Sequence, residues 1–373
     1  MRIGIDATPL LGRRTGIGTY TSHLIQALAA REGDRITATA FTLRGRHELS
    51  DAVPPGVDVR ARPLPARGLR AAWARGEWPP VELLCGPVEV FHATNFVLPP
   101  PGRAAGVLTI HDLAYLSLPD TVSTASRAYR ELVPRGLYRA DVVLTPSAAV
   151  AEQVCDAYRV DPGRVRVAPL GVDAEWAATA VPGESFRRAQ GLPERYLVSV
   201  STLEPRKNLQ ALVDAYLGWA AQDAAAPGLV LVGGAGWGDG LRVAGPGQDK
   251  VVRTGHLAPS DLRQVVAGAA ALVFPSLDEG FGLPPLEALA CGVPVLASDL
   301  PVTREVLGDQ ATFCEATEPE SLRAGLRDVV ERAVGTPSSR REHAARYTWE
   351  RCAALTREAY SAAVEGSGRS PGR

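Results

Sequence analysis

The sequence predicts an α/β protein built from two doubly wound domains, each with its own parallel sheet. Short apolar runs alternate with helical patterns along both halves of the chain, as repeated strand–helix units do. The runs are continuously apolar, which suits strands buried on both faces of a parallel sheet. The length of 373 residues also exceeds what one hydrophobic core usually supports, so two domains are expected.

The apolar runs form two series separated by a polar stretch with Pro and Gly, residues 171–185. In the first series we expect strands at residues 3–7, 37–42, 57–61, 88–92, 106–110, 142–146 and 165–168. In the second series we expect them at residues 196–201, 228–232, 251–255, 271–275, 293–298 and 311–314. The first domain is therefore predicted over residues 1–175 and the second over 176–345. The end of the chain, residues 366–373, has the composition of a disordered tail.

Composition excludes several classes of function. The chain is 46% hydrophobic and 22% charged with a net charge of −1, which gives no reason to expect a nucleic-acid partner. Residues 1–7 already have the pattern of a strand rather than of a signal peptide, and no run approaches the ~20 apolar residues that span a bilayer. The five cysteines are scattered without metal-ligand or disulfide spacing. These features fit a cytoplasmic protein.

The most informative segment is FPSLDEGFGLPPLEALACGVP, residues 274–294, which places Glu279 and Glu287 on either side of a glycine-rich turn. The turn follows an apolar strand, and a helix is expected to begin near Pro284 and Pro285, since proline fits a first helical turn. Backbone N–H groups at such a turn, with the helix dipole, favour an anion such as a diphosphate. The amides expected to serve it are those of Gly280, Phe281, Gly282 and Leu283.

Carboxylates repel a diphosphate, so the two glutamates are better placed at its two ends. There each can accept hydrogen bonds from sugar hydroxyls. A site that holds a hydroxylated group, a diphosphate and a second hydroxylated group in line describes a nucleotide-sugar. The alternative interpretation is a plain strand–turn–helix connection with two solvated carboxylates.

This segment resembles the E-x7-E motif of retaining glycosyltransferases of the GT-B fold, in family 4. Other segments match that family in order: MRIGIDATPLLGRRTGIGTYTSHLIQAL, TIHDL, VLTPS, VRVAPLGVD, VSTLEPRKNL, LVLVGG and TGHL. The resemblance covers residues 1 to about 360. It implies two Rossmann-like domains that face a cleft, with the acceptor bound by the first and the nucleotide-sugar by the second. It also implies that a C-terminal helix, residues 346–365, crosses back to the first domain.

Two cations are expected to neutralise the diphosphate. All but two of the 40 lysines and arginines are arginine, and one of the two lysines, Lys207, follows Arg206 directly after a strand. At the start of a helix they would stabilise the charge that grows on a departing diphosphate. The family often has Gly-Arg where this chain has Ser201-Thr202, so Arg206 is expected to carry more of the phosphate contact. A solvated basic helix start is the alternative.

In the first domain, His111 and Asp112 follow the strand at 106–110. The resemblance implies that His111 contacts the reacting sugar, while Asp112 is expected to orient the loop or the imidazole. His92 is a second, weaker candidate.

The resemblance also places the loop of Gly16 and Gly18 over the donor phosphates, although two glycines alone equally suit a plain β–α turn. Arg13 and Arg14 in that loop would contact a charged acceptor or stay solvated.

Further residues at strand ends are assigned by the resemblance. Gly233 and Gly234 would let the backbone approach the nucleotide, His256 and Leu257 would contact the base, and Ser147 would face the cleft. Trp237 could stack on a base or simply pack. Residues 60–78 hold five arginines and two tryptophans; they indicate a mobile basic loop and helix face rather than a membrane or acceptor element.

The expected function is transfer of a hexosyl group from a nucleotide-sugar to an acceptor hydroxyl with retained anomeric configuration. Glu279 would hold sugar hydroxyls and Glu287 the ribose. GDP-mannose is favoured over UDP- and dTDP-sugars because the opening segment and VSTLEPRKNL resemble mannosyltransferase subgroups.

No cofactor or metal is expected, since the Asp-x-Asp pair of the other major glycosyltransferase fold is missing. The acceptor would be a polysaccharide, a lipid-linked sugar or a small natural product, with at most peripheral membrane contact. Two alternatives remain: an enzyme of the same fold with different chemistry, such as an epimerase or a pseudo-glycosyl coupling enzyme, and a two-lobed binding protein without catalysis.

Overall fold

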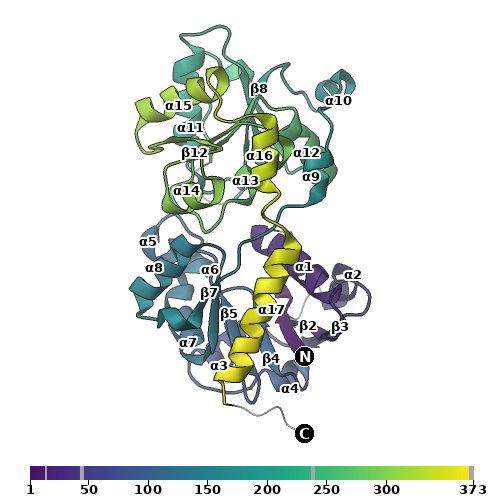
Figure 1. Ribbon diagram of the computed structural model, residues 1–373. Coiled ribbons are helices and arrows are strands. Elements are labelled where there is room, and N and C mark those ends of the chain that lie inside the picture. The colour runs from purple at the N-terminus through teal and green to yellow at the C-terminus, as the bar shows by residue number, and fades with distance from the viewer. Residues whose placement is uncertain (13–14, 43–45, 237–239, 369–373) are drawn as a thin grey trace. The chain divides into compact units, whose positions relative to one another are not determined.

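The computed structural model describes residues 1–12, 15–42, 46–236 and 240–368, and the chain divides into two compact units. Unit 1 comprises Met1–Leu116, Thr124–Gly171 and Thr348–Arg373, and unit 2 comprises Ser117–Ser123 and Val172–Tyr347. Each unit is built around one parallel sheet with helices packed against it (Figure 1). This is the predicted α/β architecture.

Unit 1 contains a seven-stranded sheet in the order β3-β2-β1-β4-β5-β6-β7. Its strands are β1 (Arg2–Asp6), β2 (Arg35–Thr42), β3 (Asp58–Pro63), β4 (Val90–Ala93), β5 (Ala105–Thr109), β6 (Val142–Thr145) and β7 (Val165–Val167). Its helices are α1 (Gly16–Ala29), α2 (Leu49–Ala52), α3 (Ala66–Trp73), α4 (Glu82–Cys85), α5 (Ala114–Ser117), α6 (Thr124–Arg127), α7 (Tyr129–Arg139), α8 (Ala148–Tyr158) and α17 (Trp349–Gly366). The strand order reverses beside β1, which pairs with β2 on one side and β4 on the other.

The C-terminal helix α17 returns to unit 1, as expected. It packs against α1 and against β4, β5 and β6 (Figure 1), and its Cys352, Tyr360 and Ala363 are fully buried. At the crossing, a Cβ on Gly171 would lie 2.3 Å from the backbone nitrogen of Trp349. Only glycine lets the outgoing and returning segments pass so closely.

Unit 2 contains a six-stranded sheet in the order β10-β9-β8-β11-β12-β13. Its strands are β8 (Tyr196–Val200), β9 (Gly228–Val232), β10 (Val251–Gly255), β11 (Ala271–Phe274), β12 (Val295–Ser298) and β13 (Thr312–Cys314). Its helices are α9 (Ala174–Ala178), α10 (Glu184–Ala189), α11 (Leu209–Ala220), α12 (Pro259–Ala267), α13 (Leu283–Cys291), α14 (Pro301–Leu307), α15 (Pro319–Glu331) and α16 (Pro337–Ala344).

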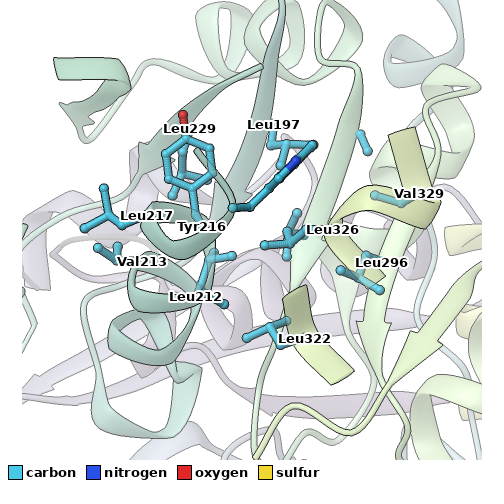
Figure 2. Close-up of a cluster of buried hydrophobic side chains, with 14 of the residues drawn as sticks. Leu197, Leu212, Val213, Tyr216, Leu217, Leu229, Leu296, Leu322, Leu326 and Val329 are labelled. Carbon is cyan, nitrogen blue, oxygen red and sulfur yellow. The ribbon is translucent and has the colours of Figure 1, made fainter. Parts of the chain in front are cut away.

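A buried apolar cluster fixes one face of this sheet (Figure 2). Leu212 and Tyr216 of α11 and Leu326 of α15 pack over Leu197 of β8, and all four side chains are fully buried. Burial of each such side chain contributes about 1.5–3 kcal/mol. The cluster therefore stabilises β8 and its neighbouring strands, whose carboxyl ends carry the loops described below.

Every predicted strand is present, with ends within two residues of those expected. Two helix starts differ. The first helix begins at Gly16, so Gly16 and Gly18 lie within its first turn rather than in a loop before it, because the Thr15 side chain accepts a hydrogen bond from Gly18 N and caps the helix there. Arg206 and Lys207 lie in a separate 3-10 turn, Pro205–Lys207, and α11 begins only at Leu209, after Asn208 in a left-handed conformation.

Candidate functional site

The loop between β11 and α13 carries a cluster of backbone donors. Gly282 has a φ of +89°, where glycine is favoured, and turns the chain into α13 at Leu283. Within the described ranges, the amides of Phe281, Gly282 and Leu283 have no hydrogen-bond acceptor. Buried or helix-start amides of this kind are ready donors for an anion.

The two prolines change how this anion site is built. Pro284 and Pro285 occupy the first turn of α13 and carry no N–H. The first turn therefore offers Leu283 rather than the usual set of three or four amides. The glycine turn before the helix must therefore supply the remaining donors. The sequence pattern alone does not separate the amides of this turn from those of the helix start.

The loop after β8 is fastened to the loop after β11. Leu277 N donates to the carbonyl of Arg206 over 2.9 Å, and Arg206 Nη1 donates to the carbonyl of Asp278 over 2.7 Å. These bonds join neighbouring strands of the sheet at their carboxyl ends, where α/β sheets bind ligands. They hold Arg206 and Lys207 beside the glycine turn.

Glu279 is buried against these two cations. Its side chain is 9% exposed; Oε1 lies 2.5 Å from Lys207 Nζ and Oε2 lies 3.4 Å from Arg206 Nη1. Burial alone would raise the pKa of Glu279, but the charges of Lys207 and Arg206 outweigh it, and the pKa lies below its usual value. Glu279 is therefore an ionised carboxylate inside a charge-balanced cluster.

Lys207 is also positioned by an aromatic ring. Its ammonium lies 5.4 Å from the ring centroid of Phe274, the last residue of β11. Such a cation–π contact contributes roughly 0.5–1 kcal/mol and fixes the direction of the charge. The strand end thus orients the lysine as well as carrying the following loop.

Glu287, the second carboxyl of the motif, has a different environment. It lies partly buried on α13, and no hydrogen bond or ion pair reaches it from the described part of the chain. Burial raises the pKa of Glu287 to about 8, assisted by the charge of Asp173 and opposed by Arg263. Arg263 itself pairs with Glu175 over 2.7 Å. Glu287 is left able to bond with hydroxyl groups of a ligand.

The glycines after β9 fit closely against the loop after β8. Gly233 has a φ of +147°, and a Cβ there would lie 1.8 Å from the carbonyl oxygen of Ser201, so no other residue fits. Leu203 N donates to the carbonyl of Gly234 over 3.1 Å. A cavity of about 160 Å³ lies beside this turn, and the buried hydroxyl of Ser201, on its lining, has no partner in the described structure.

His256 and Leu257 follow β10 at the same edge of the sheet. His256 is exposed and Leu257 is partly buried. Trp237 lies outside the described residues.

In unit 1, His111 is a neutral imidazole that donates a hydrogen bond to the backbone. It is 8% exposed, and its Nε2 lies 2.8 Å from the carbonyl oxygen of Thr94. A carbonyl only accepts, so Nε2 carries the proton and Nδ1 keeps its lone pair. Burial lowers the pKa of His111, which keeps the imidazole neutral. The rings of Tyr20 and Phe96 pack edge-on against it, with centroids 5.0 and 5.8 Å away.

The chain matches two families of glycosyltransferase domains. Residues 14–176 match the family described as Glycosyltransferase Family 4, and residues 184–348 match that described as Glycosyl transferases group 1. The O-antigen chain mannosyltransferase B of Escherichia coli is 26% identical over 96% of this chain and 99% of its own. The D-inositol 3-phosphate glycosyltransferase of Stackebrandtia nassauensis is 30% identical over 100% of this chain and 93% of its own.

The chain belongs to glycosyltransferase family 4. The sucrose-phosphate synthase of Thermosynechococcus elongatus superposes on this glycosyltransferase with a TM-score of 0.71 at 19% identity, over 96% of this chain and 98% of the other. At that identity the similarity concerns the fold, which is GT-B.

His92 is not available to a substrate of this glycosyltransferase, and the interpretation of it as a second site candidate is wrong. It lies within β4 and is fully buried. Its Nδ1 lies 2.7 Å from the Tyr360 hydroxyl and its Nε2 lies 2.6 Å from the Thr109 hydroxyl. Burial lowers its pKa to about 3, so the ring is neutral. His92 links α17 to the sheet.

The remaining described site candidates of unit 1 make contacts within the protein's own helices and loops. Ser147 is buried and caps α8 by accepting from Val150 N over 3.3 Å. Asp112 accepts a hydrogen bond from Ala114 N over 3.1 Å, a contact within its own loop. Gly16 and Gly18 lie in the first turn of α1. Arg13 and Arg14 lie outside the described residues.

The basic segment at 60–78 forms the end of β3 and the helix α3. Trp73 is buried and its Nε1 donates to the carbonyl of Pro79 over 3.0 Å, whereas Trp78 is 69% exposed. None of the described helices of the glycosyltransferase is long and apolar enough to cross a bilayer. The same residues contain no group of three or more His, Cys, Asp or Glu that would hold a metal ion.

Sequence reasoning missed three residues around the site. Glu204 lies 4.0 Å from Arg206, and Arg263 and Asp173 set the electrostatics of Glu287. Glu204 stands inside the recognised LEPRKN segment, and its spacing from Arg206 was an available signal. Arg263 and Asp173 come from α12 and from the start of unit 2, so only the fold brings them to Glu287.

Proposed function

We propose that this glycosyltransferase moves a hexosyl group from a nucleotide-sugar to an acceptor hydroxyl, with retention of the anomeric configuration. The observation that carries the proposal is the position of Lys207 and Arg206 beside the amides of Phe281, Gly282 and Leu283, for which the described residues offer no acceptor. Two cations and three amide donors suit a diphosphate, and they suit it better as charge grows on it during cleavage of the glycosidic bond.

The two glutamates would bind the two ends of the donor. Glu279 is ionised and can accept hydrogen bonds from the hydroxyls of the transferred sugar. No hydrogen bond or ion pair reaches Glu287 from the described residues, so its oxygens can bond with a ribose diol. The family resemblance assigns His111 a contact with the reacting sugar, and its unprotonated Nδ1 supports a role as acceptor of a hydroxyl proton.

Retention would be achieved at one face of the sugar. The departing diphosphate would take the proton of the acceptor hydroxyl as the new bond forms. The ion pairs of Glu279 support this route, because a carboxylate held by two cations is a poor nucleophile for a covalent intermediate. Water exclusion would limit hydrolysis of the donor.

GDP-mannose is the proposed donor. It is supported by the similarity to the E. coli O-antigen chain mannosyltransferase B along nearly the full length of both chains, and UDP- and dTDP-hexoses are the competing donors. We propose a sugar-containing, lipid-linked or small-molecule acceptor.

Donor hydrolysis tests the proposal without knowledge of the acceptor. The purified protein would be incubated with GDP-mannose, UDP-glucose and dTDP-glucose, and nucleoside diphosphate release would be followed. NMR of the released sugar before it mutarotates would report its anomeric form. We expect release from GDP-mannose above the others, with the anomeric configuration of the donor. Release of the opposite anomer would contradict retention, and a protein that neither hydrolyses nor binds any of the three would contradict the proposed donor set.

A further inference from the structure

The cations proposed to bind the diphosphate are already paired. Glu279 is the hydrogen-bonding partner of the Lys207 ammonium at 2.5 Å, and its second oxygen lies 3.4 Å from Arg206. Arg206 also lies 4.0 Å from Glu204. Among the described residues, two positive groups thus face two carboxylates, and these four side chains together carry no net positive charge for an incoming anion.

A diphosphate that contacts Lys207 must therefore compete with Glu279. The carboxylate cannot simply turn into water, since only 9% of its side chain is exposed. A buried charge that loses its cation is strongly destabilised. Binding of a bare diphosphate would leave Glu279 with weaker contacts to both cations, and this loss would count against binding.

The transferred sugar changes this balance. Its hydroxyl groups are hydrogen-bond donors, and Glu279 offers oxygens that only accept. Hydroxyl donors can replace the hydrogen bond that the Lys207 ammonium gives to Glu279, while the ammonium turns to the phosphates. A nucleoside diphosphate has no such groups next to its terminal phosphate.

We propose that Glu279 acts as a built-in competing anion, which disfavours the nucleoside diphosphate and is compensated by the sugar hydroxyls of the intact donor. The inference rests on the proposed function. It gives Glu279 a role in specificity besides holding the sugar, because a site can discriminate by an unfavourable contact with the wrong ligand. The product diphosphate would bind weakly and leave readily, while the nucleotide-sugar would bind well.

The test is Glu279→Gln, which keeps the shape and removes the charge. Calorimetry would give the Kd of GDP and of GDP-mannose, or of whichever nucleotide pair wild type binds. We expect Glu279→Gln to tighten nucleoside diphosphate binding by about 10-fold or more, the scale of one hydrogen bond to a charged group. The nucleotide-sugar should gain less, so that its advantage over the diphosphate shrinks.

Glu204→Gln is the matched control. It removes a carboxylate charge that lies near Arg206, whereas the carboxylate that contacts Lys207 stays in place. It should change diphosphate affinity by less than about 3-fold. In a Lys207→Ala background, Glu279→Gln should have a smaller effect, because the contested cation is gone. If Glu279→Gln does not fold, Glu279→Ala serves with the same expectation.

The outcomes are distinct. If wild type binds nucleoside diphosphate and Glu279→Gln binds it no more tightly, the competing-anion role is overturned and the proposed function stands. Equal tightening in Glu204→Gln would also overturn it, since the effect would then be a general change of charge. If wild type binds no nucleotide, the proposed function fails together with this inference.

Discussion

Glu279 and Glu287 belong to one motif, yet their surroundings give them opposite properties. Glu279 is buried and Glu287 is partly buried, and burial alone would raise the pKa of each. Lys207 and Arg206 reverse that effect at Glu279, whereas Asp173 reinforces it at Glu287. The difference shows that spacing in the sequence selects the residues, while neighbours from distant segments decide their charge.

The two carboxyls should therefore affect stability with opposite pH dependence. Glu279 has a folded pKa below the ordinary value of 4.5, so its contribution is present above that value and is lost as the pH falls through the folded pKa. Glu287 has a folded pKa of about 8. Its contribution is present below 4.5 and is lost as the pH rises through about 8.

The largest expected effect comes from Lys207→Ala, which should make the environment of Glu279 resemble that of Glu287, a carboxyl that forms no ion pair with a described cation. Without its nearest cation, the pKa of Glu279 should rise, and the diphosphate should lose a positive contact. Transfer or donor hydrolysis should fall at least ~100-fold, the scale of one lost electrostatic contact in a transition state. Turnover measured under saturating donor checks this.

The other lysine supplies the control for that variant. Lys250 donates to the carbonyls of Ala224 and Ala226 and lies away from the glycine turn. Lys250→Ala should keep turnover within about twofold of wild type. Near-normal turnover in Lys207→Ala would contradict the assignment of the site.

Glu287→Gln removes the second carboxyl of the motif and keeps its shape. Above about pH 8, where Glu287 is ionised, it should weaken nucleotide binding by about 10-fold, because a carboxylate accepts a ribose hydrogen bond more strongly than an amide does. Wild-type affinity should increase as the pH rises through about 8 and Glu287 ionises, and the variant should lack this step. Calorimetry between pH 6.5 and about 9 tests both points.

The same variant makes a separate prediction for stability. Since ionisation of Glu287 destabilises the fold at high pH, Glu287→Gln should melt at a higher temperature than wild type above pH 8. A gain of about 1 kcal/mol corresponds to roughly 2–4 °C. A melting-temperature difference that stays constant from pH 5 to about 9 would contradict the buried, proton-bearing state of Glu287.

Unit 1 contains a buried hydrogen bond between neutral groups, and its loss should have a smaller effect than the loss of the charged contacts in unit 2. Tyr360 of α17 and His92 of β4 share a buried hydrogen bond of 2.7 Å. Tyr360→Phe leaves a ring nitrogen of His92 without its partner, and it should cost about 1–2 kcal/mol of unfolding free energy. Denaturant unfolding checks this, with the 87% exposed Tyr138 changed to Phe as a control that should be neutral. A loss as small as that of the control would remove the structural role of this bond.

Much of the fold followed from the sequence because parallel strands buried on both faces leave continuous apolar runs. The helix starts were less predictable. The position of α1 depends on the Thr15 cap, and the separate turn of Arg206 and Lys207 depends on a left-handed residue at Asn208. Neither feature changes the apolar pattern.

The candidate site was predictable where one segment carries it. The turn at Gly282 and the pair Glu279 and Glu287 can be found in 21 consecutive residues. The ionisation of Glu287 could not be foreseen, because Asp173 and Arg263 reach it through the fold. His92 was misjudged because its burial under Tyr360 depends on a helix that returns from the other end of the chain.

We propose that Lys207 and its neighbours form the diphosphate site for a nucleotide-sugar. The most direct measurement is calorimetric binding of GDP, UDP, dTDP and ADP to wild type, Lys207→Ala and Lys250→Ala. We expect one nucleotide to bind selectively, with affinity reduced about 10-fold or more by Lys207→Ala and unchanged by Lys250→Ala. Absence of binding by all four nucleotides, or equal effects of the two lysine variants, would contradict the account.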